Sequence, residues 1–374
     1  MAKKCQKKIK SKPKAQLKKK TNKTRKSRIE KTQEKKELHK FEIKSGLLFE
    51  DILSKVIQLK DGRYGVLCEN GEFLIFEINE KNEMERDMSF QLPGSNQFCQ
   101  LGNELLVFNG FNTISFWILD GTKMHELEEY NTIFSIVTYC MEPINDDICA
   151  ICGPNDTIEI AKYDGKKLGI TYINYQKSKS KNKKSKINLD SNTGGIGCLY
   201  YQKKYNRLLA SHFNNVVRVW NCDFNKDKYD LFKEVENVTS FAGKVIHEIN
   251  NKIIIGGKGV ITLLNNKTYE IIDFIDLGNL NYEIFSMEVI KYYNFKEFVV
   301  CGLSNGKILG VDIAKKKVEF NKEKINNTGK NNELSVKDGK VCFYGENISY
   351  IFKVEKKNMI LIASHDHTLK LIEY

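Results

Sequence analysis

The sequence predicts an all-β fold, a seven-bladed β-propeller of four-stranded antiparallel blades, preceded by a basic tail. Three observations predict it. From Phe41 onward, short alternating strands are separated by Gly, Asn and Asp turns, with almost no helical periodicity. One strand-turn-strand pattern recurs seven times in this region. The net charge of +13 comes from residues 1–40, and the rest of the chain is nearly neutral.

The repeat is clearest at residues 208–221, LLASHFNNVVRVWN, where an apolar strand, a polar turn and a second alternating strand follow one another. Alignment on the turn residue Asn215 locates six further copies. Their turn residues are Gly71, Asn112, Asp156, Gly259, Gly306 and His367. Successive turns are 41, 44, 59, 44, 47 and 61 residues apart. Four of these spacings match the period of a propeller blade, about 40 to 50 residues, so we predict seven blades.

The two longest spacings each contain a polar insertion. The first is QKSKSKNKKSKIN at residues 176–188, which has six lysines and no acidic residue. The second lies at about residues 321–339. We expect both to be loops between blades, and the first to place a basic segment on one edge of the ring.

The repeated pattern resembles the WD-repeat β-propellers over about residues 41–374. Trp220 and Asn221 stand where that family usually has its Trp-Asp dipeptide. The last copy, LIASHDHTLKLIEY, places Ile372 and Glu373 there. No copy has the opening Gly-His dipeptide, so the resemblance implies that the family's His, Ser and Trp hydrogen-bond network is largely missing. We interpret four residues as structural positions of the repeat: Asn215, Trp220, Asp366 and His367.

The resemblance also implies how the ring closes. The last copy stops at Tyr374 after its third strand, while the alternating segment HKFEIKSGLLFE at residues 39–50 belongs to no repeat. In WD-repeat propellers an amino-terminal strand completes the last blade, which removes two exposed sheet edges. We therefore expect Phe41 and Ile43 on the buried face of that strand. The predicted domains are a tail, residues 1–39, and a propeller, residues 40–374.

The tail is the most distinctive candidate for function. Residues 1–40 hold 18 Lys and Arg against three Glu, with no aromatic residue before Phe41, so we expect the tail to be largely disordered or partly helical. The segments KKIK and RKSR fit short import signals. Such an arm would bind a phosphate backbone by counterion release, without base stacking. Its candidate contact residues are Lys7, Lys8, Lys10, Lys18, Lys19, Lys20, Arg25, Lys26 and Arg28. The alternatives are a merely solvating tail or a lysine-rich genome composition.

Other motifs favour structure over chemistry. Cys149 and Cys152 form a CxxC, but residues three apart in a strand point to opposite faces, so we expect two buried thiols. The run His365-Asp366-His367 falls in a repeat turn. The glycine-rich segments 193–197 and 256–260 lack phosphate-loop spacing. We predict no catalytic, cofactor-binding or metal-binding residues.

The function that these features favour is a non-enzymatic scaffold in a multi-subunit assembly. Its partners would be other proteins, with the arm contacting RNA, DNA or an acidic protein in ribosome biogenesis or chromatin. The propeller would be monomeric within that complex. The alternatives are a cytoplasmic scaffold, such as a ubiquitin-ligase adaptor or cytoskeletal component, and an enzyme built on a propeller.

Composition bears on location as well. No apolar run reaches membrane-helix length, and the lysine-rich first 30 residues do not resemble a signal peptide. We therefore expect an intracellular protein with no membrane association and with its ten cysteines reduced. The import-like segments favour a nuclear or nucleolar location over a cytoplasmic one.

Overall fold

In a computed structural model, the chain divides into two units, Met1–Lys40 and Phe41–Tyr374. The structure describes residues 42–374 except 93, 111, 132–137, 155, 175–194, 239–244, 279–281, 292–294, 296, 323–346 and 356. The predicted tail, the lysine insertion and nearly all of the second polar insertion lie outside these residues.

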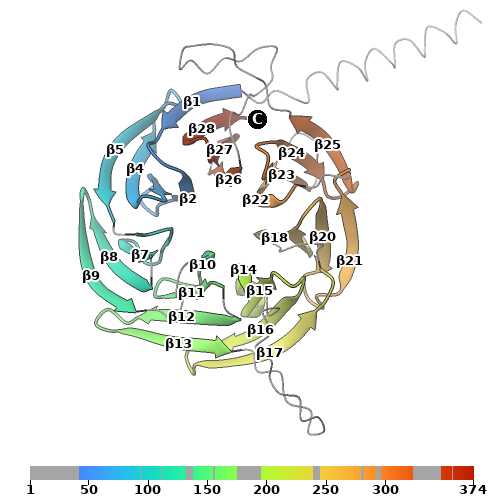
Figure 1. The fold of residues 1–374 in the computed structure, drawn as a ribbon, viewed down its shortest axis with the longest axis horizontal. Coiled ribbons are helices and arrows are strands. Elements are labelled where there is room, and N and C mark those ends of the chain that lie inside the picture. Colours follow the sequence, from blue (N-terminus) through green and yellow to red (C-terminus); the bar gives the residue numbers. More distant parts are fainter. Residues whose placement is uncertain are drawn as a thin grey trace, which may run out of the picture. The chain divides into compact units, whose positions relative to one another are not determined.

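The second unit is a ring of seven four-stranded antiparallel sheets, the blades (Figure 1). The first three blades consist of β2 (Leu53–Gln58), β3 (Tyr64–Cys68), β4 (Glu72–Ile78) and β5 (Met84–Gln91); β6 (Gln97–Gln100), β7 (Leu105–Asn109), β8 (Thr113–Asp120) and β9 (Lys123–Asn131); and β10 (Cys140–Pro143), β11 (Ile148–Cys152), β12 (Thr157–Tyr163) and β13 (Leu168–Asn174).

The next three blades consist of β14 (Ile196–Gln202), β15 (Arg207–His212), β16 (Val217–Asp223) and β17 (Lys228–Val235); β18 (Val245–Ile249), β19 (Lys252–Gly256), β20 (Val260–Asn265) and β21 (Ile271–Asp276); and β22 (Ile284–Ile290), β23 (Phe298–Leu303), β24 (Ile308–Asp312) and β25 (Lys317–Lys322). A 3-10 turn, Lys203–Tyr205, joins β14 to β15 and is the one helical element in the described part of the chain. The predicted seven-bladed, all-β propeller is confirmed.

The seventh blade closes the ring. It contains β26 (Ile348–Val354), β27 (Met359–Ser364) and β28 (Thr368–Glu373), and β1 (Glu42–Leu48) is its outer strand, paired antiparallel with β28. The predicted closure by an amino-terminal strand is thus consistent with the sheet order. Phe41 lies outside the described residues.

The side chains that anchor β1 differ in part from those expected. Ile43 is only partly buried, because a bulge at Lys44 interrupts the alternation next to it. Leu47 packs against the core between the seventh and first blades, and Phe49, 5% exposed, is part of that core. The anchoring residues therefore lie after the bulge.

The apolar core lies between neighbouring blades. Five second strands, including β11 and β27, are buried at every residue, and β15 and β19 at every residue after the first, because each strand lies between the faces of two adjacent blades. The outer strands alternate or are largely exposed, as in β5 and β17. This difference explains why the second strands are nearly continuous apolar runs in the sequence, whereas the fourth strands carry many charges.

The predicted turn residues share one backbone feature. Six of the seven aligned positions have φ between 62° and 86°: Gly71, Asn112, Asn215, Gly259, Gly306 and His367. At Gly71 only glycine fits, since an added Cβ would lie 1.9 Å from the carbonyl oxygen of Leu92. The alignment of the copies therefore corresponds to one backbone geometry between the second and third strands.

Candidate functional site

The topology assigns the loops to two faces of the ring. In each complete blade, the turn between the second and third strands and the connection to the next blade lie at the same end, because the strands alternate in direction. We call this the turn face. Segment 175–194, which contains the lysine insertion, leaves β13 at Asn174 and rejoins the described chain at Gly195 on this face. Glu42, where the tail joins β1, lies at the opposite face, since it pairs with Glu373.

A buried charged network joins the third and fourth blades on the turn face. His212 and Arg218 are 2% and 5% exposed, and both contact the carboxylate of Asp156. His212 Nδ1 lies 3.1 Å and Arg218 Nη1 lies 3.7 Å from Asp156 Oδ1. Arg218 Nε also donates to Glu234 at 2.8 Å. Because Asp156 is the turn residue of the third blade, this network ties that turn to the next blade.

Arg218 is not among the residues singled out from the sequence, although a signal for it exists. It lies three residues after the turn of its repeat, and the same position holds Glu159 in the third blade and Lys370 in the seventh. All three side chains are at most 5% exposed. A charged residue in the middle of an alternating apolar strand, at the same place in three repeats, identifies this position.

The four residues predicted as structural positions of the repeat lie in the core or in turns. Trp220 is 6% exposed within the core between the third and fourth blades, and its indole Nε1 has no hydrogen-bond partner among the described residues. Asn215 adopts the left-handed turn conformation. Asp366 accepts hydrogen bonds from the amide and hydroxyl of Thr368. The carbonyl of His367 accepts a bond of 2.9 Å from the amide of Phe49, which links this turn to the segment after β1.

The CxxC cysteines point to different interfaces. Cys149 belongs to the core between the second and third blades, and Cys152 to the core between the third and fourth. Both are fully buried, and all cysteines of the described residues are free thiols. Within the described ranges, no three His, Cys, Asp or Glu side chains gather in a way that could hold a metal ion.

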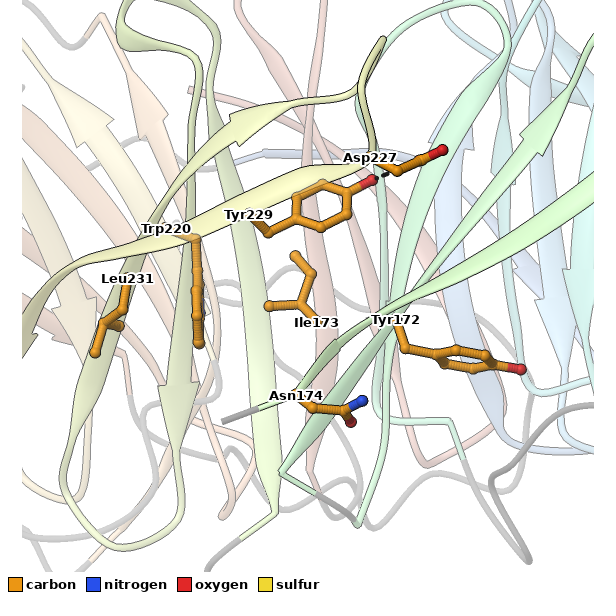
Figure 2. A pocket seen from close by; sticks show the side chains of 7 residues that line it. All are labelled: Tyr172, Ile173, Asn174, Trp220, Asp227, Tyr229 and Leu231. Atoms are coloured by element: carbon orange, nitrogen blue, oxygen red, sulfur yellow. Dashed lines mark hydrogen bonds between the residues drawn. The ribbon is translucent and has the colours of Figure 1, made fainter. Parts of the chain in front are cut away.

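A groove of about 410 Å³ opens between the outer strands of the third and fourth blades. Figure 2 shows its lining residues, Tyr172, Ile173, Asn174, Trp220, Asp227, Tyr229 and Leu231. Tyr172 and Leu231 are 42% and 41% exposed. Asp227 accepts a hydrogen bond from the Tyr229 hydroxyl at 3.3 Å and forms an ion pair with Lys162. The groove therefore combines the apolar side chains Ile173, Trp220 and Leu231 with polar groups such as Asn174, and its one acidic group is already paired.

The first strands of the blades line a central channel with a cavity of about 300 Å³. Each strand contributes a polar side chain: Lys55, Gln97, Glu142, Tyr200, His247, Glu288 and Tyr350. Several of these groups are held by main chain of the wall. The Lys55 ammonium donates to the carbonyl of Met141 at 3.1 Å, and Glu142 accepts from the amide of Tyr201 at 2.9 Å. The channel therefore contains titratable groups of the kind that an enzyme would need. The hydrogen bonds of Lys55 and Glu142, however, join the first strands of different blades and so stabilise the fold.

Burial changes the titration of the channel groups. Loss of hydration raises the pKa of Glu142 to about 8 and that of Glu288 to about 7. The same cause lowers the pKa of His247. Near neutral pH, Glu142 is therefore largely protonated in the folded protein and Glu288 is about half protonated.

We expect stability to fall with rising pH through the range set by these two glutamates. In the unfolded chain they ionise near the ordinary pKa of 4.5, whereas the folded protein holds their protons up to about pH 7 to 8. Stability is therefore fully present below about pH 4.5 and lost progressively above it. The double variant Glu142→Gln and Glu288→Gln should be more stable than wild type by several kcal/mol near pH 8, on the order of 5, and equal to it near pH 4. Denaturant unfolding across this range measures the difference, and parallel pH profiles would contradict the assignment.

Comparison with known proteins identifies the fold. No family model and no curated protein matches the sequence. Among solved structures, the crystal structure of the WD40 β-propeller domain of Doa1 matches with a TM-score of 0.63 and 11% sequence identity. The match covers 89% of this chain and 97% of that one. No helix in the described part of the chain is both long and apolar enough to span a membrane. The repeats, the ring and this similarity together show that the chain has the fold of a WD40 β-propeller.

Proposed function

We propose that this protein is a non-enzymatic scaffold that binds other proteins in a multi-subunit assembly. The arrangement of the turn face is the observation that supports this proposal. Seven turns and the connections between blades, including the long segments 132–137, 175–194 and 323–346, are attached to one end of a ring with a packed core. Loops on a rigid framework are the usual place for binding residues, because they vary without disturbing the core.

In its more specific form, we propose that the tail binds an anionic partner, RNA or DNA, in the nucleus. Glu42, the first described residue after the tail, and Asn174, the last described residue before the lysine insertion, lie at opposite faces of the ring. The nine candidate residues of the tail, Lys7 to Arg28, would act through charge alone, because no aromatic residue lies among them.

Removal of the tail's charge should abolish most binding to single-stranded RNA at low salt. For the full chain we expect log K to fall linearly with log salt, with a slope of roughly −6 if all nine cations engage. These nine residues are half of the 18 Lys and Arg in residues 1–40, so a variant with all nine changed to Gln should make the slope shallower by about 6 and leave only the weak binding of the remaining cations. A tail of scrambled sequence and unchanged composition is the matched control and should bind like wild type. Fluorescence anisotropy over a salt series measures both, and RNA binding that persists at high salt would contradict the proposal.

The scaffold itself is tested by affinity purification and mass spectrometry, with and without residues 1–40. A stable set of stoichiometric partners supports it, and a protein recovered alone contradicts it. A reporter fused to the first 40 residues separates the nuclear form from the cytoplasmic alternative, such as a ubiquitin-ligase adaptor or cytoskeletal component. Nuclear accumulation favours the former, and diffuse cytoplasmic signal the latter.

An enzyme is the second candidate, and the channel is the feature that favours it. Glu142, His247 and Glu288 lie around one cavity, and burial shifts the pKa of all three. A turnover that is lost in the Glu142→Gln variant while the partner set is retained would establish catalysis there.

A further inference from the structure

The outer strand of the third blade differs from the other six outer strands. Where each of those pairs with the third strand of its blade, a bulge inserts one extra residue. The extra residues are Lys44, Asp87, Leu127, Phe232, Ile272 and Glu319. β13 instead pairs with β12 through seven consecutive residues without a register shift. Because a bulge bends an edge strand away from a new partner, β13 is the one regular outer edge in the described part of the ring.

β13 also lacks the charges that protect the other edges. Its sequence, LGITYIN, contains no charged residue and no proline. Each of the six other outer strands contains at least two charged residues, as in MERDMSFQ of β5 and IIDFID of β21. Charged side chains on an edge strand discourage pairing with another chain. β13 therefore lacks both of the usual protections.

The turn before β13 shows which of its main-chain groups are free for pairing. The amide of Asp164 donates to the carbonyl of Lys167 at 3.2 Å, so this pair is hydrogen-bonded. Bonded and non-bonded pairs alternate along an antiparallel ladder. Leu168, Ile170 and Tyr172 therefore turn their N–H and C=O groups away from β12. No strand of the described chain lies beyond β13 in its sheet.

The groove of Figure 2 lies along this edge. Ile173 and Asn174 of β13 lie along one side, with the Tyr172 ring directed away from Trp220, and Trp220 and Leu231 of the fourth blade lie on the other side. Its volume of about 410 Å³ has room for at least one large side chain. A strand added to β13 would direct alternate side chains toward this groove.

We propose that β13 is a docking edge that pairs with an extended, uncharged segment of a partner protein, with an apolar side chain of that segment filling the groove. The outward-facing N–H and C=O groups of β13 are spaced as in a β-ladder, and an extended main chain is the partner that matches this spacing. Ile173, Trp220 and Leu231 provide contacts for an apolar side chain, and the paired Asp227 offers no free charge to a charged one. This inference rests on the proposed scaffold function and assigns one of its surfaces.

The test uses the full chain and a phage-displayed library of random linear peptides. We expect selected peptides to alternate apolar residues, to lack charge, and to slow amide hydrogen exchange within residues 168–174. The variant Tyr172→Pro removes an outward-facing amide without touching the ladder to β12, and proline is tolerated at such positions. It should weaken binding by about tenfold or more, as expected for the loss of one or two hydrogen bonds.

The matched control is Tyr172→Thr, which removes the ring but keeps the amide and should retain most of the affinity. Thermal unfolding of both variants verifies that they fold, and hydrogen exchange in wild type tests the site independently of them. Equal binding by Tyr172→Pro, protection outside residues 168–174, or no selected peptide would overturn the proposal. Protection of β13 that appears only with concentration-dependent dimerisation would overturn it in favour of pairing between two copies. If affinity purification still recovers partners, the proposed scaffold function is retained and only the assignment of β13 as a docking edge is rejected.

Discussion

Deletion of residues 40–48 is expected to lower the midpoint of thermal unfolding by about 10 °C or more, because the ring would lose the strand that closes its seventh blade. β1 contributes a ladder to β28, the packing of Leu47 against the core, and an ion pair of 2.7 Å between Lys44 and Glu373. Its removal also exposes the edge of β28 and the apolar surface beneath. Differential scanning calorimetry measures the shift.

Two controls separate closure from a general effect of truncation. Deletion of residues 1–39 should leave the midpoint unchanged, since the predicted tail lies outside the propeller unit. Leu48→Ser should also have little effect, because Leu48 is 60% exposed although it lies in the same strand. An unchanged midpoint after deletion of residues 40–48 would show that β1 does not hold the ring closed.

Phe73→Ala should destabilise the protein by about 3 to 5 kcal/mol, and lower the unfolding midpoint by roughly 5 to 10 °C. Phe73 of the first blade is fully buried and meets Phe98 and Phe108 of the second blade at ring-centroid distances of 5.0 Å, both edge to face. Gly65 approaches the same ring so closely that an added Cβ would lie 2.9 Å from it. Truncation therefore leaves a cavity at a blade interface with little freedom to collapse.

The control for this substitution is Phe274→Ala on β21, where the ring is 47% exposed. It should cost about 1 kcal/mol or less, because nearly half of its surface is already in water and less contact is lost than at Phe73. Chemical denaturation of the three proteins gives the comparison. Equal losses at Phe73 and Phe274 would contradict the proposed role of interblade packing.

Much of the fold could be predicted because each repeat is specified by residues that are close together in the sequence. A turn that needs a residue with positive φ, followed by an alternating strand, gives the same sequence pattern at Gly71 and at His367, although their side chains differ. The bulge at Lys44 could not be predicted in this way. It depends on how β1 pairs with β28, far away in the chain, and the buried anchor is Phe49 after the strand, whereas Ile43 and Leu47 are both partly buried.

The candidate surfaces were less predictable, because they form between blades. Tyr172 and Leu231 are ordinary strand residues in the sequence, and they line one groove only because the third and fourth blades are adjacent. In the same way, Lys55, Glu142 and Glu288 belong to three different repeats and meet only at the central channel. Nothing in the spacing of these residues indicates that they share a cavity.

The sequence by itself determined the class of fold and the number of blades, since both depend on local periodicity, and its resemblance to the WD-repeat propellers implied which strand closes the ring. Only the tertiary structure decided which carboxyl groups are buried in the channel and which edge strand is left regular. These features depend on contacts between residues of different blades, and the free energy of such contacts is set by packing and desolvation that no single repeat contains.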